Sequence, residues 1–174
     1  MIESGSRGWK EHKNPNFSPH LEYKIDTEML RKILVNGPIT QENISSFLAS
    51  IYENTGTGGH SVFIGQVRAD IKGANRVKAI EYSSYEKMAE TEAGKIRESI
   101  LAEFNDVKSV EILHSVGIVK AGEVSLFVLV SAVHRHHAIS ACSKVVEMIK
   151  ATLPVWKKEI FEDNSTMWKE NSLA

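Results

Sequence analysis

Apolar residues recur with helical spacing in three parts of the chain, and each part predicts a helix. The first helix begins after Thr40, which suits an N-cap, and ends within 54–59. Its apolar stripe comprises Ile44, Phe47, Leu48, Ile51 and Tyr52. The second covers 87–104, with Met88, Ala89, Ala93, Ile96, Ile100 and Phe104 on one side. The third covers 134–154, stops at Pro154, and has the stripe Ala138, Ala141, Cys142, Val145 and Ile149.

Alternating or continuous apolar residues between these helices predict strands. We expect a long hairpin over 60–86 and a further strand over 110–117. The apolar run 124–133 is long enough to form a buried central strand. A second hairpin over 155–170 closes the pattern. Hairpins mixed with helical crossovers indicate an α+β fold with a mostly antiparallel sheet and three main helices.

The chain length suits a single domain with a sizeable core. The sequence has 174 residues, of which 42% are hydrophobic and 25% are charged, as in an ordinary globular protein. We assign the domain to 21–174, beginning with a short strand at 21–25. Residues 1–20 are polar and lack the apolar core of a signal peptide, so we expect a flexible N-terminal extension.

Charge and cysteine content exclude several classes of protein. The net charge is -1, from 21 Lys+Arg and 22 Asp+Glu, whereas proteins that coat nucleic acid usually carry a clear basic excess. No apolar run approaches about 20 residues, so no membrane span is expected. Cys142 is the single cysteine, which rules out an intrachain disulfide or a cysteine-based zinc site. A reducing, cytoplasmic location follows most simply.

The segment 133–138, VHRHHA, raises the question of a metal site. Zinc ligands on a helix are usually spaced i, i+4 and need further ligands, but these histidines are spaced i, i+2, i+3 without a second cluster. We therefore expect no metal, and a solvated first helical turn at His136 and His137. His134 and Arg135 lie where a buried strand ends and a helix begins. Free N–H groups at that end predict a site for an anion, phosphate above all.

Two other cationic positions have competing interpretations. Lys150 falls at the edge of the third helix's apolar stripe, so it is neither core nor fully solvated. It either complements the helix C-terminus or has a pKa lowered by burial and nearby cations, suited to proton transfer. Arg68 ends an apolar strand that contains Gly65, and either lies on the rim or points its guanidinium at a ligand. Cys142 is expected to be a buried structural thiol.

Four segments in series resemble the large, catalytic subunit of molybdopterin synthase. They are VFIGQVR, IEYSSYEKMAE, LHSVGIVKAGEVSLFVLVSAVHR and MIKATLPVWKKEIFED with MWKEN, within 58–171. The resemblance implies an α/β-hammerhead fold and a homodimer within a heterotetramer. It also implies the conversion of cyclic pyranopterin monophosphate (precursor Z) to molybdopterin, with two sulfurs installed as a dithiolene. The sulfur donor would be the C-terminal Gly-Gly thiocarboxylate of a small ubiquitin-like subunit, and no metal or other cofactor is implied.

The resemblance also implies roles for particular residues. The family's essential lysine falls on Lys150 and its second active-site lysine on Lys157. The remaining matches are substrate-binding residues: Arg68, His134, Arg135 and Phe63. Departures occur at Thr152, where many members have a basic residue, and at Ala69, where Asn is frequent. In this assignment Lys150 shuttles a proton or polarises the reacting carbon, while Arg68 and Lys157 hold phosphate or the tail carboxylate.

The length of the third helix constrains how these residues are shared. His134 and Lys150 are separated by about 24 Å if the helix is straight, much further than a pterin phosphate extends. His134 and Arg135 therefore either have no role in the site or reach the cavity of the other protomer of a two-fold dimer. Two alternative functions stay open: a non-catalytic dimeric scaffold that captures a ubiquitin-like tail, and a metallohydrolase that uses the histidines.

Overall fold

A computed structural model describes residues 32–169. The extension predicted over 1–20 and the strand predicted over 21–25 lie outside this range. The first half contains β1 (Leu34–Asn36), α1 (Gln41–Ala49), the 3₁₀ helix η1 (Ser50–Glu53), β2 (Gly59–Gln66), β3 (Ile71–Lys72), β4 (Asn75–Ser84) and α2 (Glu86–Glu103). The second half contains β5 (Val107–Lys120), β6 (Val124–Ala132), α3 (Arg135–Thr152), β7 (Val155–Phe161) and β8 (Thr166–Lys169).

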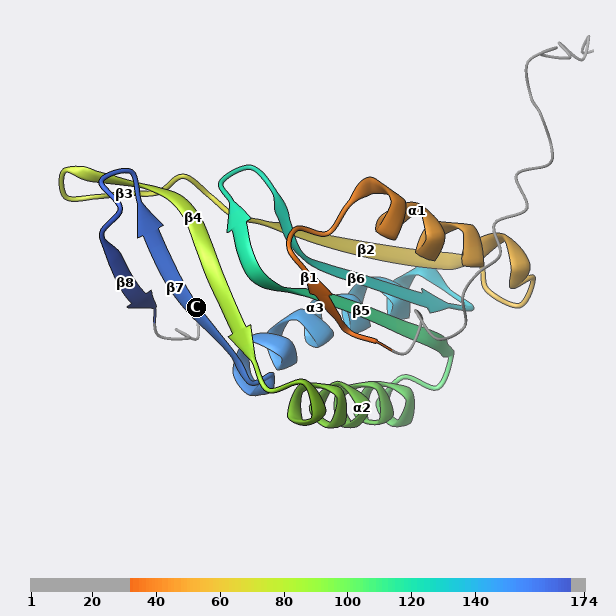
Figure 1. Ribbon diagram of the computed structural model, residues 1–174. Helices are drawn as coiled ribbons and strands as arrows, with labels where there is room; N and C mark the ends of the chain where they lie inside the picture. The colour runs from red at the N-terminus through yellow and green to blue at the C-terminus, as the bar shows by residue number, and fades with distance from the viewer. Residues whose placement is uncertain (1–31, 170–174) are drawn as a thin grey trace, which may run out of the picture.

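The strands form one mostly antiparallel sheet in the order β2-β6-β5-β4-β7-β8. The short strand β1 pairs with β5 in parallel, and β3 pairs with β4. The long strand β5 joins the two parts of the sheet, because His114 pairs with β6 while Gly117 pairs with Tyr82 of β4 (Figure 1). The predicted α+β fold, with three helices and a mostly antiparallel sheet, is confirmed.

The predicted long hairpin over 60–86 is wrong in its pairing. Strands β2 and β4 exist, but β2 pairs with β6 at one edge while β4 lies between β5 and β7. Only the two-residue strand β3 forms a hairpin with β4. An alternating pattern identifies a strand and its buried face, but it does not identify the neighbouring strand. Here β2 contacts α3, which packs on the part of the sheet that contains β2 and β6.

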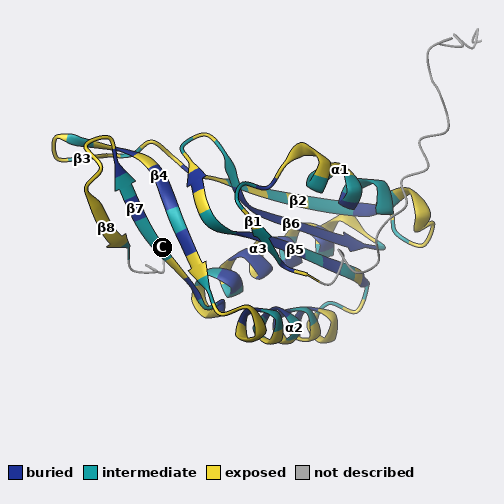
Figure 2. Ribbon diagram, viewed as in Figure 1, coloured by how far each residue is buried: buried dark blue, intermediate teal, exposed yellow. Residues whose placement is uncertain are grey.

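Strand β6 is buried on both faces, as its unbroken apolar run predicts. Phe127 and Leu129 pack with Phe47 of α1 on one face. Val128 and Val130 belong to the larger core on the other face, together with apolar residues of α2 and α3. The two helices therefore lie on the opposite side of β6 from α1, and the strand itself is dark throughout its centre (Figure 2).

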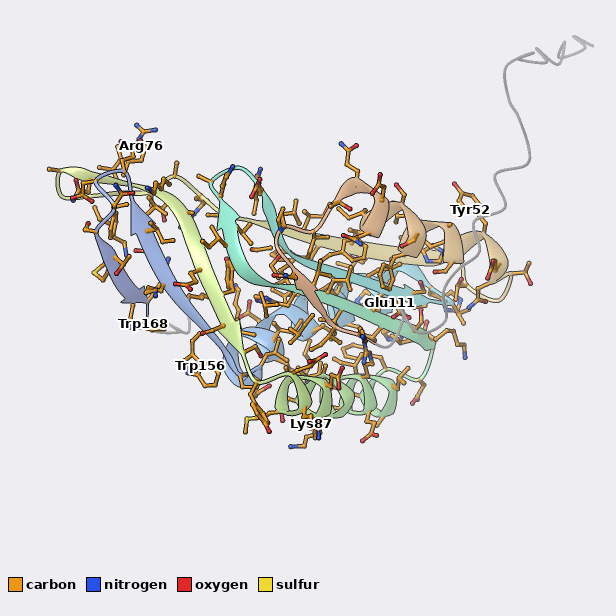
Figure 3. The ribbon with its side chains drawn as sticks, in the orientation of Figure 1. Tyr52, Arg76, Lys87, Glu111, Trp156 and Trp168 are labelled. Carbon is orange, nitrogen blue, oxygen red and sulfur yellow. The ribbon has the colours of Figure 1, made fainter. Side chains whose placement is uncertain are left out.

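The three helices match their predicted positions, with two local differences. Thr40 caps α1 through a capping box with Asn43. Tyr52 is 88% exposed, because the chain tightens into η1 and its tighter winding rotates Tyr52 off the apolar stripe (Figure 3). Met88 is 54% exposed, although Ala89, one position further, is fully buried. In the first turn of α2 the buried face therefore begins at Ala89 rather than Met88.

Helix α3 is continuous over 18 residues, so its length is about 27 Å. The predicted stripe is buried at all five positions: Ala138, Ala141, Cys142, Val145 and Ile149. Leu153 ends the helix, and Pro154 follows it. Within residues 32–169, no helix combines the length and hydrophobicity needed to cross a membrane.

Candidate active site

A cavity of about 280 Å³ lies at the C-terminal end of α3. Its wall brings together four residues that the sequence singled out: Phe63, Arg68, Lys150 and Lys157. Phe63 comes from β2, and Arg68 follows the end of that strand. Residues from β2, β4, β5, β6, α3 and β7 all contribute, so the cavity lies where the two parts of the sheet meet.

Two lysines reach this cavity because the chain reverses direction at Pro154. Lys150 lies in the last turn of α3, and the helix cannot continue through the proline. The chain then enters β7, where alternate residues face alternate sides of the sheet. Val155 and Lys157 line the cavity, whereas Trp156 and Lys158 lie on the other side. Figure 3 shows Trp156 projecting from β7 into solvent.

The wall of the cavity is cationic. Arg68, Lys150, Lys157 and Lys169 line it, and no Asp or Glu among the described residues does so. Three of these cations have carboxylate partners nearby: Arg68 Nη2 lies 2.9 Å from Asp70, Lys150 Nζ 3.4 Å from Glu147, and Lys169 Nζ 3.2 Å from Glu159. Lys157 makes no ion pair with any residue in 32–169. The positive charge of the wall therefore favours the binding of an anion in the cavity.

Lys157 is the lysine whose acidity the fold changes most clearly. Burial lowers its pKa, and the positive charges of Lys169 and Lys150 lower it further. The free amine is consequently more accessible near neutral pH than for a solvated lysine. Lys150 is half-buried at the rim, as its position at the edge of the stripe predicts.

Glu159 on β7 holds one of the cavity lysines in place through an ion pair. Its side chain is almost completely buried, and its two carboxylate oxygens contact Lys72 Nζ at 2.6 Å and Lys169 Nζ at 3.2 Å. One buried carboxylate therefore fixes a lysine of the cavity wall and the β3–β4 hairpin. A buried charge is tolerated when it is paired in this way.

Among the wall residues that sequence reasoning did not single out are His114, Tyr82 and Lys169. His114 stands at an inward position of β5, among apolar residues, and this pattern is the signal that could have identified it. Its ring is buried and packs edge-on against Tyr82, with 5.2 Å between the ring centroids. Burial lowers the pKa of His114 to about 4.

His134 and Arg135 lie at the opposite end of α3 and do not line this cavity. His134 is the N-cap, and an anion does bind there, but it is Asp106 of the same chain. The Asp106 carboxylate accepts a hydrogen bond from the His134 backbone N–H at 3.2 Å and contacts Nδ1 of His134 at 3.1 Å. Arg135 is exposed and makes no ion pair with residues 32–169.

The predicted solvated turn holds for His136 but not for His137. His136 is exposed, whereas His137 is half-buried, contacts Asp106 through Nδ1 and packs edge-on against the ring of Phe104. Desolvation would raise the pKa of Asp106, but hydrogen bonds from His134 and His137 outweigh it and leave that pKa below its usual value. Among residues 32–169, no group of three or more His, Cys, Asp or Glu side chains is arranged to hold a metal ion.

Comparison with known proteins agrees with this fold and cavity. The family described as MoaE protein matches residues 34–152. The molybdopterin synthase catalytic subunit of Dictyostelium discoideum is 39% identical over 70% of this chain and 77% of its own length. The protein of that name from Drosophila sechellia is 36% identical, and the chain spans only 36% of its length.

Solved structures show the same architecture. The molybdopterin synthase structure from Staphylococcus aureus has a TM-score of 0.71 and 30% identity, over 80% of this chain and 97% of that one. A complex of subunits 1 and 2 of the molybdopterin-converting factor from Helicobacter pylori has a TM-score of 0.66 at 20% identity, over 79% and 88%, and supports the fold alone. The fold and the cavity thus place the chain in a class of α+β proteins that have a cationic pocket. The chain belongs to the MoaE family.

Proposed function

We propose that the protein is the catalytic subunit of a cytoplasmic molybdopterin synthase. It converts cyclic pyranopterin monophosphate to molybdopterin, taking two sulfurs from the C-terminal thiocarboxylate of a small ubiquitin-like subunit. The observation that carries this proposal is the cavity at the end of α3, whose wall contains four cations and, among the described residues, no carboxylate. The substrate phosphate and the donor tail are both anions, and both need such a surface.

The two lysines divide the chemistry in this proposal. The sequence assigned Lys157 to holding phosphate or the tail carboxylate. Its burial and lowered pKa support instead a role in giving up and taking back a proton. Lys150, at the rim, polarises the reacting carbon. In this scheme the thiocarboxylate sulfur bonds to the substrate carbon to give a thioester, and water then attacks the thioester carbon, which leaves the sulfur on the substrate and releases the tail as a carboxylate. The cationic wall stabilises the oxyanion that forms in that second step. Arg68 is 77% exposed at its side chain, so it suits the phosphate or the tail at the mouth of the cavity, and Phe63 packs beside the substrate.

The partner in this reaction is proposed to be a ubiquitin-like sulfur carrier with a Gly-Gly tail. Membership of the MoaE family supports this partner. The Helicobacter pylori structure is itself described as a complex of two subunits of the molybdopterin-converting factor, although its likeness to this chain shows the fold alone. Two such partners and two copies of this chain would make a heterotetramer.

His134 and Arg135 act in the cavity of a second copy in this proposal. About 24 Å of unbroken helix separates His134 from Lys150, so one protomer does not bring both ends to one small substrate. A two-fold dimer supplies the missing end twice. The exposure of Arg135, with no carboxylate partner among the described residues, supports its availability to a neighbour.

The direct test mixes the protein with the thiocarboxylated small subunit and precursor Z and measures molybdopterin. We expect conversion by the parent, and a loss of about 100-fold or more for Lys150→Ala. Binding of the small subunit to that variant, measured by calorimetry, is expected to persist. Conversion by Lys150→Ala at the parent rate would remove the assigned role of Lys150. Absence of conversion by the parent, with tail binding intact, would favour the alternative of a non-catalytic scaffold.

A further inference from the structure

His114 is the one histidine of the described chain that lines the cavity. It is 5% exposed and packs against Tyr82 in the buried part of the wall, whereas the side chains of Arg68 and Lys150 are more exposed. Nothing in the sulfur-transfer scheme above uses it. A buried polar ring that faces a cavity needs an explanation, because burying a polar group costs free energy unless it is hydrogen-bonded.

The backbone fixes the tautomer of His114. Its Nδ1 lies 2.9 Å from the carbonyl oxygen of Ser115, and a carbonyl oxygen only accepts hydrogen bonds. Nδ1 therefore carries the hydrogen and donates it. In the neutral ring, Nε2 is left as an acceptor, and no residue in 32–169 hydrogen-bonds to it.

The ring also stays neutral at the pH of the cell. Burial lowers its pKa to about 4, and the charge of Lys157 contributes in the same direction. The charged groups that line the same cavity are Arg68, Lys150, Lys157 and Lys169, all cations, so none favours protonation of the ring. His114 consequently offers an acceptor inside a wall whose charged groups are all hydrogen-bond donors.

We propose that Nε2 of His114 accepts a hydrogen bond from an N–H or O–H of the substrate's ring system, and so determines specificity for a polar heterocycle rather than for any phosphate. This inference rests on the proposed function, because it assigns the phosphate to the cations and the ring to the inner wall. A site built to accept a hydrogen bond rejects an analogue that lacks the donor, since its own buried acceptor is then left unpaired.

Two amide substitutions separate this role from a structural one. In His114→Gln the side-chain amide reaches the position of Nε2, whereas in His114→Asn it reaches the position of Nδ1 and retains the contact with the Ser115 carbonyl. If His114 serves the substrate, Gln is the better replacement. If it only anchors the backbone of β5, Asn is the better replacement. His114→Phe keeps the ring packing against Tyr82 and provides neither group.

The measurement is the Kd for precursor Z by isothermal titration calorimetry, with the small-subunit Kd and the thermal midpoint recorded for each variant. We expect precursor Z to bind about tenfold more weakly to the Asn and Phe variants, and the Gln variant to retain most of the affinity. Binding of the small subunit should be unchanged. His60→Asn is the control, because His60 bonds Ser131 (Nδ1 to Oγ, 2.8 Å) and does not line the cavity.

The inference would be overturned if His114→Phe bound precursor Z with the affinity of the parent, or if His114→Asn bound it more tightly than His114→Gln. If the variants bind precursor Z in the expected order of affinity but the parent makes no molybdopterin, the proposed reaction would be overturned and the inference would stand. Parent protein that does not bind precursor Z at all would overturn both.

Discussion

The two ends of helix α3 both collect basic side chains, but they differ in where the neighbouring carboxylates lie. At the N-terminal end, His134 and His137 contact Asp106 of the same chain. At the C-terminal end, Lys150 and Lys157 face a cavity without a carboxylate among its described wall residues. Carboxylates do pair with Arg68, Lys150 and Lys169, but they lie outside the cavity wall, and Lys157 makes no ion pair within residues 32–169. The difference teaches that a cationic cluster can serve a ligand where the fold keeps carboxylates out of the cavity.

The helix dipole favours each end for a different reason. The N-terminus attracts negative charge, and Asp106 supplies it from the turn before β5. The C-terminus favours a cation, which accounts for Lys150 without any function. The helix dipole does not account for Lys157, which lies on β7 and whose pKa is lowered by burial and by neighbouring lysines. Lys157 therefore distinguishes the functional end of the helix best.

The largest effect is expected from Lys157→Arg, which keeps the charge but removes a titratable amine. If Lys157 exchanges a proton, conversion falls by about 100-fold or more, and the activity no longer rises with pH toward the pKa of that lysine. The measurement is the molybdopterin yield over a range of pH. If Lys157 only holds an anion, arginine serves equally well and the rate is retained.

Lys158→Arg is the matched control for that experiment. Lys158 adjoins Lys157 but lies on the other face of β7, beside Glu81 and over the ring of Trp168. Figure 3 places Trp168 on β8, pointing into solvent. The control should convert precursor Z at the parent rate. A similar loss in both variants would indicate damage to β7 rather than to the chemistry.

A smaller effect, but a decisive one, is expected from mixing two inactive variants. Lys157→Ala and Arg135→Ala each lack one half of the proposed composite site. When the purified variants are unfolded, mixed and refolded together, the mixed dimer contains one complete site. About a quarter of the parent activity should return, because half of the dimers are mixed and each has one working site.

The same experiment decides whether the two ends of α3 cooperate at all. Recovery with mixed variants requires that Arg135 of one copy serves the cavity of the other. Activity that stays absent in the mixture, while size-exclusion chromatography shows dimers, would contradict the shared site. Full activity of Arg135→Ala alone would show that the N-terminal end has no role in the reaction.

The sequence predicted the C-terminal end of α3 better than the N-terminal end, for a physical reason. Lys150 and Lys157 are brought together by a local event, the stop at Pro154 and the return in β7, and local events are visible in a sequence. Asp106 precedes His134 by 28 positions, and only the pairing of β5 with β6 brings it to the helix. A negative group does lie at this end, but it is a carboxylate of the same chain rather than the expected phosphate, and its position could not be predicted from the sequence.

The same limit applies to the fold. Strand β6 and helix α3 were predictable because their apolar patterns are complete within each element. The pairing of β2 with β6 was not, since alternation does not name a partner strand. His114 was overlooked because an isolated histidine in a strand carries no motif of its own, and its meaning depends on β4, β6 and α3 closing around it.

The smallest effect is expected from Asp106→Asn, which tests whether the N-terminal end is structural in the isolated chain. The pKa of Asp106 is lowered in the folded protein, so its ionised form stabilises the fold above the ordinary carboxyl value of 3.8. That stability disappears as the pH falls through the lowered pKa. The variant should therefore have a lower thermal midpoint than the parent at pH 7, and the two curves should approach each other only as the pH falls below 3.8 and through the lowered pKa of Asp106.

Activity measured on Asp106→Asn shows whether the N-terminal end of α3 has a role beyond stability. If Asp106 only caps α3, the variant loses stability but converts precursor Z at the parent rate at a temperature where both are folded. If Asp106 also orients His134 toward the neighbouring copy's cavity, KM for precursor Z rises as well. Thermal midpoints that coincide at pH 7 would contradict both, and would leave the carboxylate beside His134 and His137 as an incidental contact.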